Sequence, residues 1–406
     1  MAVSETMLSS QFSRINLEPT KYPGVTVTEI SAEVDDVSPD GIPPQGITTE
    51  VKETSHTRSM SSQFSTDVEH IRVSFTILNV LEKYGKHMTH KALSNTVVVD
   101  AESQPPAWSG KYKFLSNVHH HVRQGEPVQL TLPAFPCKSS NRANKVLGHL
   151  PDLGEELALE LLQKMGTDVE KVYTPGAQVT IATDGVLFND ILGITDEDCW
   201  DYGEELKAII AEKDLYTIRF RRCESLLGLK SEEDTTRETY LANTKMCRAE
   251  LESRFGSSEE ALTEHIKSDK DTNLTYCGMI KFLESEMETS PTLAGQSRAT
   301  RMKVYRKLAK RMMQRSEAFT LAIRTLYPLH IRLSMHSSSG ATKLSIPLIP
   351  TRDGNFQKSP WHSCVAVSLD GVYRCVHQDE VRDSHELVYR YGRPYFFRET
   401  SKAVRA

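Results

Sequence analysis

An alternation of strand and helix patterns in the middle of this chain constrains its fold more than any other feature. Short apolar or alternating runs, which predict strands, are separated by capped helical runs. The strand patterns lie at 128–132, 179–182 and 215–220, and the helix signals begin at Asp152 and around 195–198. Because strands that alternate with helices form parallel sheets, this part predicts an α/β sheet built from βαβ units.

The flanking segments have different periods. Residues 230–327 are predicted to be mostly helical, and from Pro328 onward the hydrophobic period is two, which predicts strands. The runs 331–336 and 343–349 predict one two-stranded hairpin, and Asp370-Gly371 predicts another. The expected fold is therefore α/β, with a Rossmann-like mixed sheet, a helical insertion and a strand-rich C-terminal part.

Residues 1–65 are rich in Ser and Thr and show no sustained apolar period, so we expect a disordered leader. Residues 66–406 are expected to form one folded domain. Its parts are an α/β part at 66–229, a helical part at 230–327 and a strand-rich part at 328–406. Within it, a helix from Val68 is expected to stop at Gly85.

One helix of the α/β part has clear signals at both ends. Asp152 and Glu155 form a capping box at its start, and Gly166 is expected to end it.

Composition excludes several classes of protein. The net charge of −5 over 406 residues argues against a general nucleic-acid binder. No apolar run approaches the ~18 residues that span a bilayer, and the N-terminus has no secretory signal. The seven cysteines are scattered without a CxxC pair, which argues against a disulfide framework or a zinc finger. We expect a cytoplasmic, reduced protein.

The run 331–336 carries the most informative polar pattern. Arg332 and His336 lie on one face of the predicted strand, residues 337–340 follow as Ser-Ser-Ser-Gly, and Lys343 opens the returning strand. Two cations beside a small-residue loop suit a phosphate monoester. The alternative is a solvated polar face. No P-loop and no GxGxxG accompanies the pattern, so it does not indicate a nucleotide.

Further candidates follow two strands of the α/β part. Lys138 lies in the loop after the first strand, and Asp184 lies directly after the second. Ligands gather at the carboxyl ends of strands in open α/β sheets, which makes both residues candidate ligand contacts. The alternative for each is an ordinary turn.

The C-terminal part gathers histidines beside charged residues: His362, His377, Arg382, His385 and Glu386. Imidazoles beside carboxylates suit proton transfer near neutral pH. Alternatively, His377-Gln378-Asp379 begins a facial triad for non-haem iron.

Several longer strings resemble the isocyanide (isonitrile) synthase family, which includes the pyoverdine and dityrosine biosynthesis proteins. The resemblance runs from about residue 66 to the end and suggests a stand-alone fungal member. The strings are LPAFPCKSSN, VLGHLPDLGEELAL, LTYCGMIKFLE, IRLSMHSSSGATKLSIPLIP, SPWHSCVAVSLDGVYRCVH and EVRDSHELVYRYGRPYFFRE.

The resemblance implies an enzyme that joins the α-amino group of an L-amino acid to ribulose 5-phosphate. The ketone carbon of the sugar becomes the isocyanide carbon, and no metal, flavin or nicotinamide cofactor is required. Tyrosine is the first choice of amino acid, before tryptophan and valine. An implied partner is a downstream oxygenase or cytochrome P450, with no nucleic acid and no membrane. The alternatives are an N-formyl product of the dityrosine type, a non-haem iron oxygenase and a non-catalytic phosphate-binding module.

With this resemblance, the candidate residues take three roles. The sugar phosphate is assigned to Lys138, Arg332, Ser338, Lys343 and Arg382. Proton transfer is assigned to His336, His362, His377 and His385, with Glu386 or Asp184 orienting or accepting. The amino-acid side chain is assigned to Phe135, Tyr276 and Trp361.

Overall fold

The computed structural model describes residues 56–87 and 108–400, with side chains described from residue 66 onward. The predicted leader lies outside the described residues up to position 55. Over 56–65 the prediction of disorder is wrong, because helix α2 (His56–Glu82) already begins at His56. The described residues from His70 onward belong to one compact unit.

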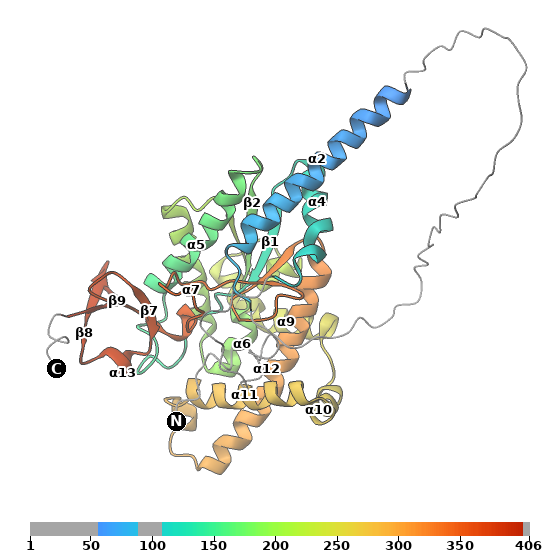
Figure 1. Cartoon of the computed structure of the whole chain (residues 1–406). Coiled ribbons are helices and arrows are strands. Elements are labelled where there is room, and N and C mark those ends of the chain that lie inside the picture. Colours follow the sequence, from blue (N-terminus) through green and yellow to red (C-terminus); the bar gives the residue numbers. More distant parts are fainter. Residues whose placement is uncertain (1–55, 88–107, 401–406) are drawn as a thin grey trace, which may run out of the picture. The chain divides into compact units, whose positions relative to one another are not determined.

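A five-stranded parallel sheet lies at the centre of this unit (Figure 1). Its strands are β1 (Val128–Pro133), β2 (Ala177–Ala182), β3 (Ile218–Arg221), β4 (Ile331–Ser334) and β5 (Leu344–Ser345). They lie in the order β3-β2-β1-β4-β5. The chain therefore adds β2 and β3 on one side of β1, and then β4 and β5 on the other side. This is the order of a Rossmann-like sheet, and it confirms the predicted fold class.

Helices connect the first three strands, as the sequence predicts. Helix α5 (Leu153–Glu170) leads from β1 to β2, and α6 (Gly185–Leu192) and α7 (Asp196–Glu212) lead from β2 to β3. The predicted capping box at the start of α5 is confirmed: the Asp152 carboxylate accepts from Gly154, and Glu155 accepts from the Asp152 backbone at 2.9 Å.

Gly166 does not end α5, contrary to the prediction. A Cβ at this position would lie 2.6 Å from Oγ1 of Thr217, just before β3. The glycine therefore permits close packing of the helix against the sheet rather than ending the helix.

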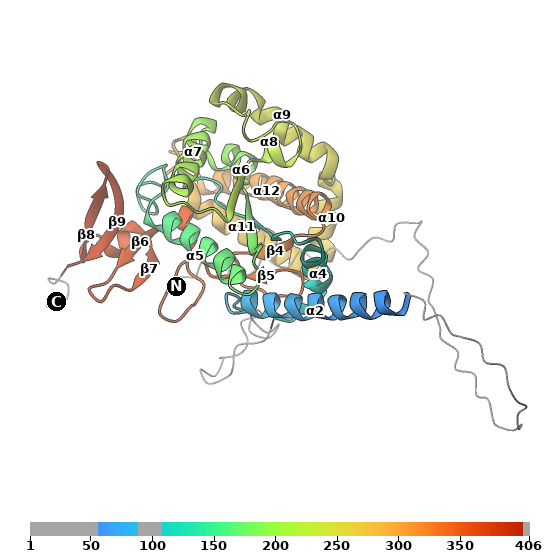
Figure 2. The ribbon, with the colours of Figure 1, turned by 90° about the horizontal axis from the view of Figure 1, so that it is seen from above.

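The segment 230–327, predicted as mostly helical, packs onto α6. It contains α9 (Arg237–Phe255), α10 (Glu259–Ser268), α11 (Lys270–Glu286) and α12 (Arg298–Leu326). Helix α12 contacts α6, α9 and α11 (Figure 2). Arg248 donates to the carbonyl of Val186 at 2.6 Å, and Arg315 donates to that of Leu187 at 2.7 Å. Two buried guanidinium groups thereby hold the first turn of α6.

The predicted hairpin between 331–336 and 343–349 is wrong. Strands β4 and β5 pair in parallel, with Leu333 opposite Leu344 and Ser334 opposite Ser345. The loop 335–343 therefore returns the chain to the start of the neighbouring strand, through a connection shorter than most parallel crossovers. The alternating pattern predicted the strands correctly but carried no information on their relative direction.

The strand-rich part forms a second, mixed sheet in the order β7-β6-β9-β8. Its strands are β6 (Cys364–Val367), β7 (Tyr373–Val376), β8 (His385–Arg390) and β9 (Arg393–Glu399). The hairpin predicted at Asp370-Gly371 is confirmed, because β6 and β7 are antiparallel. Arg390 and Tyr395 both donate to Glu156 of α5, which attaches this sheet to that helix.

Shorter helices complete the fold. They are η1 (Lys111–Phe114), α4 (Leu115–Gln124), α8 (Cys223–Leu226), η2 (Pro291–Leu293), η3 (Pro360–His362) and α13 (Gln378–Val381). Among the helices of the described ranges, none combines the length and apolarity that crossing a lipid bilayer requires.

Candidate active site

Polar side chains from the end of β2, from β4 and the loop after it, and from η3 interact near the point where the strand order reverses. In open parallel sheets, this point is where ligands bind. We call the gathered residues the strand-end cluster. It comprises five of the predicted residues, which interact electrostatically: Asp184, Arg332, His336, Lys343 and His362.

Arg332 and Lys343 are the cations of the cluster. Leu333 lies opposite Leu344 in the parallel register, so the residues before these leucines lie side by side on one face of the sheet. Nε and Nη1 of Arg332 are buried without an acceptor among the described residues. Burial lowers the pKa of Arg332 to about 10, against the opposing effect of Asp184. Burial and the adjacent Arg332 lower the pKa of Lys343 to about 7.

These two cations form no salt bridge within the described part of the chain. Buried polar groups are normally paired, so unsatisfied guanidinium donors beside a destabilised ammonium group indicate a place for an anion. A phosphate group would supply the missing acceptors and the missing negative charge.

Asp184 is the acid of the cluster. It follows β2 directly, and its Oδ1 is buried without a hydrogen-bond donor among the described residues. Burial raises its pKa to about 6, although Arg332 and His362 act in the opposite direction. The backbone after it is tightly packed, since a Cβ on Gly185 would lie 1.9 Å from the carbonyl oxygen of Pro136. Asp184 is thus fixed in place and poised to exchange a proton near neutral pH.

The cluster holds two histidines in different environments. Burial, together with Lys343 and His362, lowers the pKa of His336 to about 3, so this imidazole is neutral at neutral pH. His362, at the end of η3, lies with Nδ1 3.2 Å from the Glu286 carboxylate, and its side chain is 19% exposed.

Glu286 and two of its partners belong to the site although the sequence did not indicate them. Glu286 ends α11, and its carboxylate accepts from Lys145 at 2.7 Å and from the hydroxyl of Ser139. Glutamates alternate at 284, 286 and 288, and nothing in their spacing distinguishes the middle one. Only the packing of α11 against the loop after β1 reveals it.

The loop 337–340 lies between β4 and β5 in the chain and is held in place by hydrogen bonds. The hydroxyl groups of Ser338 and Ser345 are 2.6 Å apart, which links the loop to β5. The indole N–H of Trp108 donates to the Gly340 carbonyl at 3.0 Å. Ser338 is buried and its hydroxyl is engaged within the protein, so it fixes the loop's conformation.

Three aromatic residues are predicted to contact the amino-acid side chain, and two of them pack against each other. The rings of Phe135 and Trp361 lie 5.2 Å apart and are buried. Phe135 has a φ of +58°, a strained conformation for a non-glycine residue, and the Thr183 hydroxyl donates to its carbonyl at 2.7 Å. Tyr276 lies elsewhere, on α11, where its hydroxyl donates to the Arg306 carbonyl at 3.4 Å.

Lys138 is not in the cluster. Its ammonium group is fully buried and binds Asp152 and Glu155, each at 2.8 Å, as well as the Pro360 carbonyl. The two carboxylates that cap α5 thus use this lysine to anchor the loop after β1. No hydrogen-bonding capacity remains for a phosphate.

The remaining predicted residues lie in the second sheet or in the segment between its strands. His377 caps α13, and Arg382 is exposed and donates to the Ala143 carbonyl at 3.3 Å. His385 lies 2.8 Å from the Ser384 hydroxyl, and Glu386 forms an exposed salt bridge with Arg398. Within the described ranges, no three His, Cys, Asp or Glu side chains converge as metal ligands, so the iron alternative lacks a ligand set at His377.

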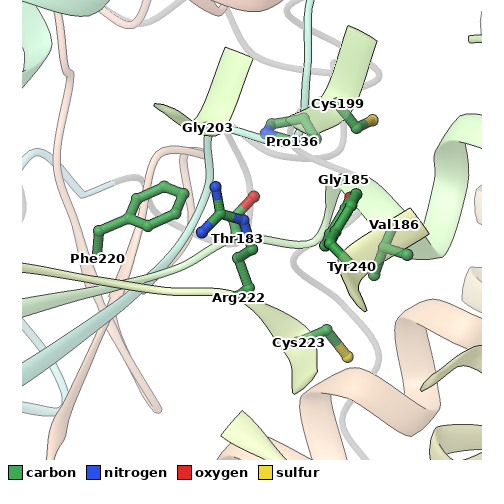
Figure 3. A pocket seen from close by; sticks show the side chains of 10 residues that line it. All are labelled: Pro136, Thr183, Gly185, Val186, Cys199, Gly203, Phe220, Arg222, Cys223 and Tyr240. Carbon is green, nitrogen blue, oxygen red and sulfur yellow. The ribbon is translucent and has the colours of Figure 1, made fainter. Parts of the chain in front are cut away.

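A small cavity of about 10 Å³ borders the same sheet edge between β2 and β3 (Figure 3). It has room for about one water molecule. Thr183 and Gly185, on either side of Asp184 in the sequence, line it together with Arg222. Arg222 stacks on Trp200 and pairs with Glu232, so this cavity is part of the support for the site and not a substrate pocket.

These features define a Rossmann-like α/β protein with a buried cluster of cationic, acidic and imidazole side chains at the reversal of strand order. The sequence model of the family described as "Pyoverdine/dityrosine biosynthesis protein" matches residues 118–388. The chain belongs to this family.

Individual proteins with related names are similar to most of this chain. Isocyanide synthase xanB of Aspergillus fumigatus is 41% identical over 334 residues, which cover 81% of this chain and 42% of that protein. L-tryptophan isonitrile synthase AmbI2 of Fischerella ambigua is 31% identical over 295 residues, covering 71% of this chain and 83% of that protein. The crystal structure of the PvcA protein from Pseudomonas aeruginosa matches 81% of this chain and 100% of its own, with a TM-score of 0.67 and 25% identity. The chain thus spans less than half the length of xanB.

Proposed function

We propose that this protein is an isocyanide synthase, which converts the α-amino group of an L-amino acid to an isocyanide with ribulose 5-phosphate as the one-carbon donor. The observation that carries the proposal is the strand-end cluster, in which an unsatisfied cation pair adjoins an acid and two imidazoles. A sugar phosphate that reacts at its ketone needs cations to bind its phosphate group and acid and base groups to transfer protons. The family membership and the names of the relatives support the same assignment.

The cationic half binds the phosphate. Arg332 offers two buried donors without acceptors in the described chain, and Lys343 gains stability as a cation when a dianion lies beside it. The loop 337–340 forms the adjoining wall.

The other half carries the proton transfers. Bond formation between the amine nitrogen and the ketone carbon first requires the α-ammonium to lose a proton, and loss of water then gives the imine. His362 is placed to accept the proton, the neutral His336 can hydrogen-bond the reacting groups without carrying a charge, and Asp184, with a pKa of about 6, is suited to return a proton to the departing oxygen. No metal, flavin or nicotinamide is part of this proposal.

The amino acid is proposed to be aromatic, with tyrosine as the first choice. Phe135 and Trp361 form a paired aromatic wall beside η3, and the names of two relatives specify L-tryptophan and L-tyrosine. An oxygenase or cytochrome P450 that consumes the isocyanide is the proposed downstream partner.

The test is an incubation, in the presence of a chelator, with L-tyrosine and ribulose 5-phosphate labelled at the ketone carbon. Mass spectrometry locates the label in the products, and the infrared band identifies an isocyanide group. Label in an isocyanide is the expected result. Label in a formamide alone would mean that the product is an N-formyl amino acid and not an isocyanide. Absence of incorporation with tyrosine, tryptophan and valine would overturn the proposal.

A further inference from the structure

Glu286 is a fully buried carboxylate that remains ionised. Burial would raise its pKa, but His362 and Lys145 together lower it to about 2. Its partners are the ammonium group of Lys145 at 2.7 Å, the Ser139 hydroxyl and Nδ1 of His362 at 3.2 Å.

Two groups face this carboxylate, and His362 lowers its pKa more than Lys145 does. Lys145 already supplies one full positive charge, and its side chain is 3% exposed. A buried salt bridge of this kind is electrically complete. The approach of an imidazole to the same carboxylate therefore calls for an explanation besides charge balance.

Helix α11 holds the His362 ring from two sides. Glu286 faces Nδ1, and the ring of Phe282 meets the imidazole edge-to-face at 5.1 Å between centroids. Because the two ring nitrogens lie on opposite sides of an imidazole, Nε2 is turned away from Glu286. His362 also interacts electrostatically with Asp184 and His336, so the ring lies at the cluster.

We propose that Glu286 is a positioning residue that keeps the proton of His362 on Nδ1 and leaves Nε2 as the proton acceptor of the reaction. This inference rests on the proposed function. Nε2 takes the proton that the substrate's α-ammonium loses, and the nitrogen lone pair that this frees attacks the ketone carbon. The imidazolium that forms is balanced by the Glu286 carboxylate, in the manner of a base oriented by a buried acid.

A double-mutant cycle tests this role. Glu286→Gln is expected to lower kcat by about tenfold or more, with little change in the KM for ribulose 5-phosphate. His362→Asn is expected to lower kcat further, and the double variant is expected to be no slower than His362→Asn alone. Independent, multiplicative losses would overturn the proposal. Glu156→Gln is the matched control, because it removes a buried carboxylate of α5 away from the cluster and is expected to leave kcat unchanged.

A measurement on the unmodified protein covers the case in which Glu286→Gln does not fold. In protein labelled with ¹⁵N-histidine, the His362 signals are identified by their loss in His362→Asn. A protonated Nδ1 at neutral pH is expected, and an unprotonated Nδ1 would overturn the proposal. If the unmodified protein shows no turnover with any amino acid, the proposed function fails, whereas this spectrum still decides the Glu286–His362 contact.

Discussion

The carboxylate of Glu286 lies 3.2 Å from Nδ1 of His362, although the two residues come from the helical and the strand-rich parts of the chain. The same carboxylate binds Lys145 of the loop after β1. One buried charge therefore joins three segments at the edge of the sheet, and the stability of the fold and the geometry of the site depend on it together.

Lys145→Met is expected to lower the free energy of unfolding by about 3–5 kcal/mol, because it removes the lysine that is paired with the buried Glu286 carboxylate. Urea unfolding followed by circular dichroism measures this change. Lys164→Met is the control. It removes an exposed salt bridge with Asp168, which is expected to contribute less than about 1 kcal/mol. Equal effects of the two substitutions would contradict a special role for the buried pair.

Arg332→Ala is expected to raise the KM for ribulose 5-phosphate by about 10- to 150-fold, which corresponds to about 1.5–3 kcal/mol of charge-assisted hydrogen bonding. The KM for the amino acid should change far less. Steady-state kinetics with each substrate varied in turn makes the comparison, and Arg352→Ala removes an exposed arginine as a control. Equal increases in both KM values would reject the phosphate assignment.

Affinity for the sugar phosphate is expected to fall as the pH rises above about 7. In the free protein, Lys343 has a pKa of about 7, lowered by burial and by Arg332, so above this pH the amine must take up a proton before it attracts the dianion. The apparent Kd should therefore rise by up to about tenfold per pH unit. Calorimetric titration between pH 6.5 and 9 measures it.

Lys343→Arg provides the control for this pH dependence, because a guanidinium stays charged over the whole range. Its Kd should be nearly independent of pH between 7 and 9. A flat profile for the unmodified protein, or the same slope in the variant, would show that Lys343 does not face the anion.

Gly185→Ala is expected to destabilise the protein by about 1–3 kcal/mol or more and to lower activity, because the new Cβ would overlap the Pro136 carbonyl next to Asp184. Gly148→Ala is the control, since a Cβ there meets nothing within 4 Å. Thermal unfolding of both variants makes the comparison. A Gly185→Ala protein as stable as Gly148→Ala would mean that the backbone of Pro136 can move away from position 185 at little cost.

Local signals explain what the sequence predicted correctly. The capping box of Asp152 and Glu155 and the βαβ rhythm depend on neighbouring residues. Asp184 is a candidate because it follows a predicted strand, and His336 because it shares a strand face with Arg332. These features require no knowledge of distant contacts.

Features set by tertiary contacts were missed or misplaced. The direction of β5 relative to β4 is decided by pairing across the sheet, and Glu286 reaches the site only through the packing of α11. Lys138 carries the expected charge, but the two carboxylates that cap α5 use it internally. His377 and His385 are close to His362 in sequence, yet His377 caps α13 and His385 begins β8 of the second sheet.

Strand β5 contributes only Leu344 and Ser345 to the outer edge of the central sheet. So short a strand has few ladder hydrogen bonds, and it is expected to open more readily than β1 or β2. An anion bound by Arg332 of β4 and by Lys343 just ahead of β5 would tie the two strands together. Binding of the anion is then expected to slow the exchange of the β5 amide hydrogens with solvent.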